Sequence, residues 1–139
     1  MTEIKFFDSL TQEEIDIRTT VFVEEQGFEE EFDTADETAL HALIYVDGKA
    51  VGCARLLKYN EESAYIIGRI AVLKEYRMLH LGSTIVNAMI EKAKELGGDT
   101  AIISAQCRAQ GFYETLGFEA SGEIYYEEYC PHIHMEKKI

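Results

Sequence analysis

Residues 77–84 combine side chains and backbone groups that are suited to binding an anion. They read Arg-Met-Leu-His-Leu-Gly-Ser-Thr and lead into a stretch with helical spacing. The first amides of a helix have no partner within the helix, and the helix dipole adds about half a positive charge there. Such a turn can bind a diphosphate, with Arg77, Ser83 and Thr84 as further donors and Gly82 allowing close approach of the backbone. The alternative is an ordinary strand-to-helix turn without a ligand.

The second chemical feature is an uneven distribution of charge. The 139 residues include 26 acids and 13 bases, a formal net charge of −13. Residues 1–40 hold 13 of the acids and two bases, whereas residues 49–108 hold nine bases and six acids. The acidity argues against general binding to nucleic acids and to anionic membranes, because both are polyanions. The acid-rich segment 24–37 is either a solvated surface, a mobile loop or the lining of a cation site.

The cysteines, Cys53, Cys107 and Cys130, are odd in number and widely spaced, which favours a reduced, cytoplasmic protein. We expect no metal, because no two pairs of ligand residues stand at zinc spacing. The hydrolase signature G-x-S-x-G is absent from the sequence. No apolar run approaches the ~18 residues of a membrane helix, and the N-terminus lacks the basic start of a signal peptide, so we expect neither.

The spacing of apolar residues predicts the elements that position these groups. A short strand at 4–7 precedes a helix that begins at Thr11, where Glu14 completes a capping box. Gly27 either ends this helix or bends the chain. The expected apolar face of this helix consists of Ile15, Thr19, Phe22 and Val23. Residues 28–39 are predicted to form an acidic loop with at most one helical turn.

The next part of the chain is strand-like. Residues 40–46, 50–58 and 64–73 are predicted to form an antiparallel meander. Asp47-Gly48 is a strong signal for a hairpin turn, and residues 60–63 are predicted to form the second turn. The meander places a strand directly before the turn at 77–84.

The remainder alternates between helices and strands. A helix is predicted over 81–96, where apolar residues recur with a period of 3.6, and Gly97-Gly98 ends it. The elements after it are expected at 101–105 (strand), 109–116 (helix), 118–129 (strand) and 132–137 (strand), the last two separated near Pro131. The order β-α-β-β-β-α-β-α-β-β predicts one α+β domain, residues 1–139, around a central mixed sheet.

Three segments together resemble the GNAT superfamily of N-acetyltransferases, and their order along the chain agrees with that family. Residues 77–82 are similar to the Arg/Gln-x-x-Gly-x-Gly/Ala acyl-CoA motif, and residues 105–118 are similar to the strand–helix segment that ends in Phe-Tyr-Glu-x-x-Gly-Phe. The third segment is the start, residues 18–41. With Pro-His-Ile-His-Met at 131–135, essentially the whole chain resembles the small bacterial ElaA/YjcF-like branch. The resemblance implies a GNAT fold, a mostly antiparallel sheet flanked by helices in three layers.

Two positions depart from the motifs of the family. His80 stands where the first motif glycine is expected, and histidine tolerates a positive φ better than most residues. Gln106 replaces the usual asparagine and offers a longer amide to a pantetheine carbonyl. We therefore expect an altered loop rather than a lost site.

The resemblance implies acetyl-CoA as co-substrate. In this family a β-bulge splays the strand before the phosphate loop from its neighbour, and pantetheine lies in the gap. The residues that would bind the co-substrate are Ile70, Ala71, Val72, Arg77, Met78, Leu79, His80, Leu81, Gly82, Ser83, Thr84 and Gln106.

The resemblance also implies catalytic roles. Tyr113 matches the tyrosine that protonates the CoA thiolate, and a phenol with a pKa of ~10 suits a thiol with a pKa of ~8.5. His132 falls where the glyphosate acetyltransferase branch has its catalytic histidine, and an imidazole can accept a proton near neutral pH. Glu25, His41 or a water molecule are the alternatives for the base. The amide of Val72 is the expected oxyanion donor.

The acceptor is expected on the side formed by the first helix and the following loop. The residues implied there are Arg18, Glu25, Asp33, Asp36 and His41. The three acids favour a cationic amine, such as a polyamine, an aminoglycoside, a lysine-like side chain or a peptide N-terminus. Arg18 either binds an acceptor carboxylate or is a buried partner of the acids around it.

The favoured function is acetyl-CoA-dependent N-acetylation of a primary amine, by a monomer or a homodimer. A non-catalytic acyl-CoA sensor on the same fold is the first alternative, because a fold does not determine function. An acyl-homoserine-lactone-synthase-like acyltransferase is the second, although 139 residues leave little room for its acyl-chain pocket.

Overall fold

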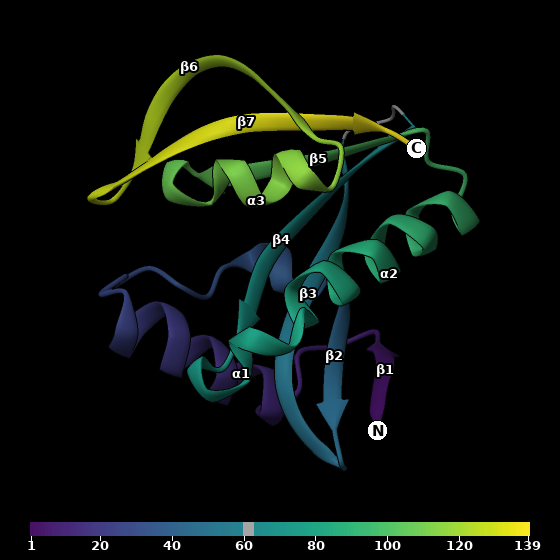
Figure 1. Ribbon diagram of the computed structural model, residues 1–139, viewed down its shortest axis with the longest axis vertical. Helices are drawn as coiled ribbons and strands as arrows, with labels where there is room; N and C mark the ends of the chain where they lie inside the picture. Colours follow the sequence, from purple (N-terminus) through teal and green to yellow (C-terminus); the bar gives the residue numbers. More distant parts are fainter. Residues whose placement is uncertain (60–62) are drawn as a thin grey trace.

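A mixed sheet with strand order β1-β2-β3-β4-β5-β7-β6 forms the centre of the molecule (Figure 1). The computed structural model describes residues 1–59 and 63–139, so most of the predicted turn at 60–63 lies outside the described residues. β4 and β5 pair in parallel, and the other neighbours pair antiparallel. The strands are β1 (Thr2–Phe7), β2 (Leu40–Val46), β3 (Lys49–Tyr59), β4 (Ala64–Val72), β5 (Thr100–Gln106), β6 (Glu119–Glu127) and β7 (Cys130–Lys138).

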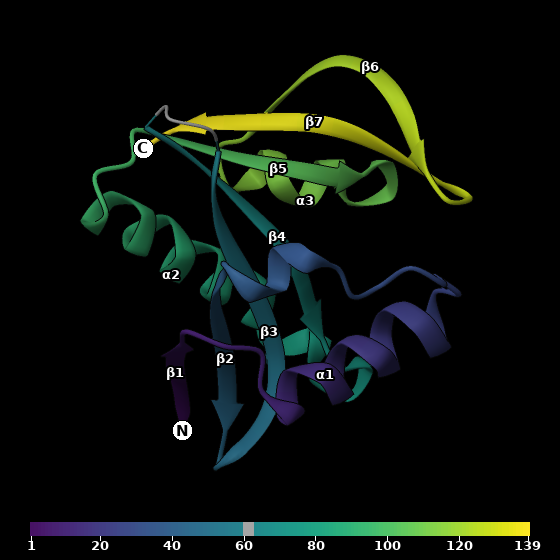
Figure 2. The same cartoon turned by 180° about the vertical axis from the view of Figure 1, so that it is seen from behind.

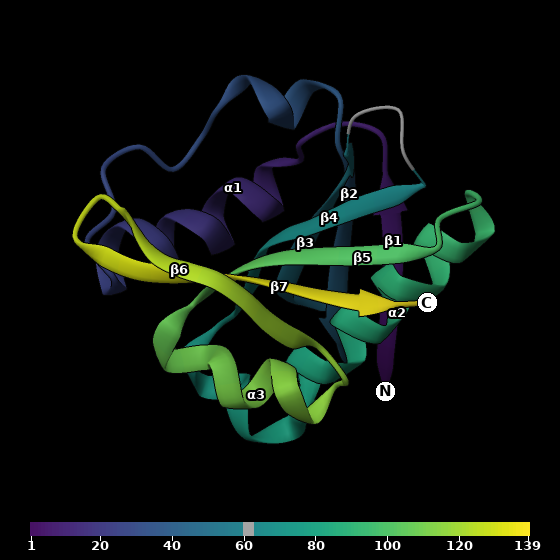
Figure 3. The same cartoon turned by 90° about the horizontal axis from the view of Figure 1, so that it is seen from above.

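Helices cover both faces of this sheet. α1 (Gln12–Arg18) lies on one face, and α2 (Leu81–Glu95) and α3 (Gln110–Thr115) lie on the other (Figures 2 and 3). The predicted order of strands and helices and the three-layer α+β architecture are confirmed. None of the helices in residues 1–59 and 63–139 is long and apolar enough to cross a membrane.

α2 packs on the sheet through the stripe that its spacing predicts. Its buried residues are Leu81, Ile85, Val86, Met89, Ile90 and Ala93. Burial of a large aliphatic side chain contributes ~1.5–3 kcal/mol relative to exposure. This face therefore fixes α2 on the sheet, and with it the turn from which the helix starts.

α1 begins where predicted but buries a different face. Thr11 caps it by accepting a hydrogen bond from the amide of Glu14 at 3.2 Å, and the helix continues as a π-helical segment, Thr19–Glu25. Of the predicted apolar face only Phe22 is buried. The buried residues are Glu14, Ile17, Arg18, Val21 and Phe22. The prediction was wrong because it assumed that only apolar residues face the sheet. Glu14 and Arg18 are buried as a pair, and the π-helical turn changes which of the residues after them face the sheet.

β4 leaves β5 soon after the two strands meet. The parallel pairing extends only from Ala64 to Ile66 on β4. Further along, the register between β3 and β4 shifts between Cys53 and Arg55, and Arg69 has a φ of 51°. This is the β-bulge that the family resemblance implies, because β4 carries one residue more than its partner here. Among residues 1–59 and 63–139, no strand pairs with the β5 side of β4 beyond Ile66, and we call this separation of the two strands the gap.

The hairpin of β6 and β7 turns earlier than predicted. Glu127 and Cys130 pair across a turn that contains Glu128, whose φ is 57°. Pro131 lies inside β7, opposite Tyr126, and not in the turn. Proline lacks an N–H but is tolerated near the start of a strand. Reading Pro131 as a turn residue therefore placed the predicted turn too late in the chain.

Candidate active site

The turn before α2 has the geometry of an anion site. A short 3₁₀ helix, Lys74–Leu79, ends at His80, whose φ of 58° is left-handed, as its place in the motif predicts. No side chain of residues 1–59 and 63–139 caps the first amides of α2. The hydroxyls of Ser83 and Thr84 instead donate to the carbonyl of His80 at 2.9 and 3.0 Å. The amides therefore remain available to an anion, while both hydroxyls already have an acceptor.

Gly82 brings this turn close to α3. A Cβ on Gly82 would lie 3.4 Å from Cζ of Phe112. Leu81 is buried in the core beneath the turn, whereas Met78 and Leu79 are exposed at its rim. The side chains of the motif thus lie in different surroundings. Any contact that all of these residues make with one ligand must come from the backbone of the turn.

Arg77 crosses from this turn to the π-helical segment. Its two terminal nitrogens lie 2.6 and 2.7 Å from the carboxylate oxygens of Glu25, and its Nε donates to the carbonyl of Val72 at 2.9 Å. The hydrogen bonds from Arg77 lower the pKa of Glu25. Glu25, a candidate base, is therefore held as a carboxylate, and Arg77 has a partner that an incoming phosphate must share or displace.

Tyr113 lies in α3 against the core. Its ring packs against Phe112 and Phe118, with centroids 5.1 and 6.1 Å away, and the side chain is almost completely buried. Burial raises the pKa of Tyr113 to about 12. The phenol is therefore protonated at neutral pH, which is the state that a proton donor needs.

Gln106 ends β5 at the gap beside β4. Its Nε2 donates to the side-chain oxygen of Gln26 at 2.9 Å, and its Oε1 accepts from Nε of Arg108 at 2.8 Å. Gln26 follows the π-helical segment directly. The side chain of Gln106 thus reaches to the α1 side of the sheet, and its amide is already engaged on both atoms.

His132 lies on β7 directly opposite Gln106. Its Nδ1 is 3.0 Å from the carbonyl oxygen of Cys130, and its Nε2 is 2.8 Å from Oε2 of Glu127. The ring of Tyr125 stacks on the imidazole at 6.1 Å. The side chain of His132 is 6% exposed, so it is enclosed by these neighbours.

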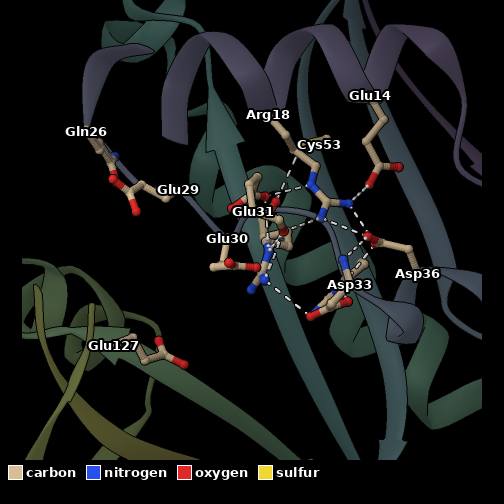
Figure 4. A network of polar contacts seen from close by, with 12 residues as sticks. Glu14, Arg18, Gln26, Glu29, Glu30, Glu31, Asp33, Asp36, Cys53 and Glu127 are labelled. Carbon is tan, nitrogen blue, oxygen red and sulfur yellow. Dashed lines mark hydrogen bonds and ion pairs between the residues drawn. The ribbon is translucent and has the colours of Figure 1, made fainter. Parts of the chain in front are cut away.

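The remaining implied residues meet in a buried ion-pair network (Figure 4). Arg18 is fully buried and donates to Glu14 at 2.8 Å, to Glu31 at 2.8 Å and to Asp36 at 2.7 Å. The ring of Phe32 covers its guanidinium at 4.6 Å. Two roles were predicted for Arg18. In the structure it is the buried partner of nearby acids.

Two more arginines complete the network. Arg55 donates to Asp33 at 2.7 Å and to Asp36 at 3.0 Å, and Arg69 lies 3.0 Å from Glu31 and 3.4 Å from Asp33. Burial opposes ionisation of Asp36, but the hydrogen bonds from the arginines outweigh it and lower its pKa to about 2. The acids at 31, 33 and 36 are thus balanced by guanidinium groups within the protein.

His41 extends this network into β2. It is fully buried, with Nδ1 2.9 Å from Oε1 of Glu14 and Nε2 2.9 Å from the carbonyl of Asp36. The ligand atoms of Glu14, Asp36 and His41 lie within 4.8 Å of one another. We assign no metal there, because guanidinium groups already occupy the two carboxylates. His41 is enclosed, with both ring nitrogens engaged, so it offers no free ring nitrogen to an acceptor.

The sequence analysis missed part of this site. Glu14, Glu31, Arg55 and Arg69 come from four separate segments, so their spacing along the chain does not show that they meet. Glu127 was missed for a different reason. A turn near Pro131 would put Tyr129 opposite His132, whereas the turn at Glu128 brings Glu127 to the imidazole.

Comparison with known proteins identifies the family of this chain. Residues 6–139 match the family model described as "Acetyltransferase (GNAT) domain". The protein YyaT of Bacillus subtilis is 37% identical over 132 residues, covering 91% of this chain and 88% of the relative. The uncharacterized N-acetyltransferase YjcF of the same organism is 32% identical over 125 residues, 87% of each chain. The crystal structure of Escherichia coli ElaA superposes with a TM-score of 0.88 at 28% identity, covering 99% of this chain and all of ElaA.

The chain therefore belongs to the GNAT acetyltransferase family, and it is an acyltransferase. Its similarity to YjcF and ElaA places it with the ElaA/YjcF-like branch, as the sequence motifs predict.

Proposed function

We propose that the protein transfers an acetyl group from acetyl-CoA directly to a primary amine of a small molecule or peptide. The observation that carries this proposal is the uncapped N-terminus of α2 beside the gap between β4 and β5. Amides without protein partners fit a pyrophosphate. The edge of β4 at Ile70, Ala71 and Val72 fits a pantetheine chain, which can pair with backbone as a strand does, and at Val72 the chain would meet a carbonyl that Arg77 already engages.

The position of Tyr113 and its protonation state support it as the proton donor. It lies in α3, which the turn at Gly82 contacts through Phe112, so the phenol is near the end of the phosphate site. Its raised pKa means that the phenol carries its proton before the reaction begins, and the same rise makes it a weaker acid than an exposed phenol. Breaking the C–S bond leaves a thiolate, and protonation of that sulfur makes CoA a better leaving group.

A screen of amines with acetyl-CoA, read by release of free thiol, tests this function. We expect turnover with at least one class of primary amine. Tyr113→Phe should lower kcat by about 10²-fold, because it removes the proton but keeps the ring. The affinity for acetyl-CoA should stay within about twofold, since the phenol is not part of the phosphate site.

Two results would contradict the proposal. Tight binding of CoA without turnover of any amine would favour a sensor. Full turnover by Tyr113→Phe would remove the proposed role of the phenol while leaving the acetyl-transfer function in place. Long-chain acyl-CoA donors in the same assay test the length of the acyl group.

A further inference from the structure

The contacts of His132 conflict with its predicted role as the base that takes a proton directly from the acceptor amine. Nδ1 faces the carbonyl of Cys130 at 3.0 Å, and Nε2 faces the carboxylate of Glu127 at 2.8 Å. Carbonyl and carboxylate oxygens are acceptors only. Both ring nitrogens are therefore already engaged by oxygens of the protein. With no free ring nitrogen and a side chain that is 6% exposed, the imidazole leaves no face for an acceptor amine.

Glu127 has the properties that His132 lacks. Its side chain is 51% exposed. The imidazole engages Oε2, and among the described residues no donor engages Oε1. A carboxylate with one oxygen fixed and the other open to solvent is oriented and able to accept a proton.

Glu127 also lies on the correct side of the sheet. His132 is directly opposite Gln106, so the two side chains share a face. Gln106 reaches Gln26 on that face, which is the α1 side. Figure 4 labels Glu127 on the hairpin, below Gln26, Glu29 and Glu30 in that view. The hairpin is tied to that segment because the carboxylate of Glu128 accepts from the amides of Glu29 and Glu30 at 2.9 Å.

We propose that Glu127 is the catalytic base that contacts the acceptor amine, and that His132 is a positioning residue that holds it. The proposal rests on the acetyl-transfer function above. An ammonium group R–NH₃⁺ gives one proton to Oε1 of Glu127, and the amine nitrogen forms a bond with the acetyl carbon. The C–S bond breaks, and its electron pair leaves with sulfur. The sulfur takes its proton from Tyr113, and the nitrogen releases its second proton to restore the phenol. Glu127, which is half exposed, returns its proton to water.

The test compares variants that separate the two residues. Glu127→Gln keeps the shape but cannot accept a proton, and we expect kcat to fall at least 10²-fold, the usual range for a general base. His132→Gln keeps an amide donor for Glu127 but is not a base, and we expect a loss of at most about tenfold. Glu127→Asp, which keeps the carboxylate, should retain more activity than Glu127→Gln. Glu123→Gln on the same strand is the matched control, because Glu123 is exposed, and it should behave as the wild type.

Affinity for acetyl-CoA and thermal unfolding, measured for every variant, separate catalytic loss from misfolding. We expect the dissociation constant of acetyl-CoA to stay within about twofold throughout. A large loss in His132→Gln with a small loss in Glu127→Gln would overturn the assignment and make His132 the base. Equal small losses in both would point to water. Absence of acetyl transfer by the wild-type protein with any amine would overturn the proposed function itself, which is a separate result.

Discussion

Buried charge at single residues distinguishes the α1 side of the sheet in this protein. Arg18 is fully buried yet has three carboxylate partners, and Asp36 is shared between Arg18 and Arg55. An arginine buried without partners would be too costly, so each member of the network depends on the others. These acids hold the loop at 29–37 on the sheet rather than supplying free negative charge to a substrate.

The variant Asp36→Asn tests whether the buried ion-pair network holds the loop at 29–37 on the sheet. At pH 7 we expect the free energy of unfolding to fall by about 3–5 kcal/mol, because the two arginines lose a charged partner. The pKa of Asp36 is lowered in the folded protein, so its contribution to stability is complete above pH 4 and is lost as pH falls toward 2. The difference between wild type and variant should therefore shrink below pH 4.

Denaturant titrations at pH 7, 5, 4 and 3 measure this difference. Asp16→Asn is the control, since Asp16 is exposed and bonds only to Gln12 among the described residues, and it should change stability by less than about 0.5 kcal/mol. An Asp36→Asn protein as stable as the wild type at pH 7 would show that the network does not fix the loop.

At the scale of elements, the turn before α2 depends on a left-handed residue between two helices. His80 occupies this position with a φ of 58°, where the family motif has glycine. A side chain in this region costs roughly 1–2 kcal/mol, and glycine avoids that cost but loses more entropy on folding. The packed face of α2 holds the turn in place despite this strain.

His80→Gly should therefore be as stable as the wild type or up to about 1 kcal/mol more stable, with acetyl-CoA affinity within about twofold. His80→Ala keeps the Cβ without the ring and should show no gain, so the pair isolates the backbone effect. Thermal unfolding and calorimetric titration with acetyl-CoA are the measurements. A loss of affinity in both variants would show instead that the imidazole binds the ligand.

At the scale of the whole molecule, the net charge of −13 acts on stability. Like charges repel within a compact protein, and this repulsion extends over a Debye length of about 30 Å at 0.01 M salt but only about 8 Å at 0.15 M. Buried pairs, such as those of Arg18, are screened much less.

Adding NaCl from about 0.01 to 0.15 M at pH 8 should therefore raise Tm, because it screens the surface repulsion and leaves the buried network intact. The same addition at pH 5, where part of the carboxylates are protonated, should raise Tm by less. A fall in Tm with salt at pH 8 would mean that favourable surface pairs outweigh the net repulsion.

The local sequence determined most of the elements and the turn before α2. Thr11, Asp47-Gly48 and Gly97 marked ends and turns, and the period of α2 marked its buried face, because these signals depend on neighbours a few residues apart. The motif at 77–82 predicted a candidate anion site for the same reason, since a strand, a turn and a helix N-terminus are consecutive.

Only the tertiary structure decided which charged groups meet. Arg18, Arg55 and Arg69 come from α1, β3 and β4, and no local pattern shows that they share four acids. The register of the last hairpin likewise decided that Glu127 contacts His132. A shift in the position of one turn changes every pair across two strands, so this contact depended on a turn that the sequence around Pro131 did not reveal.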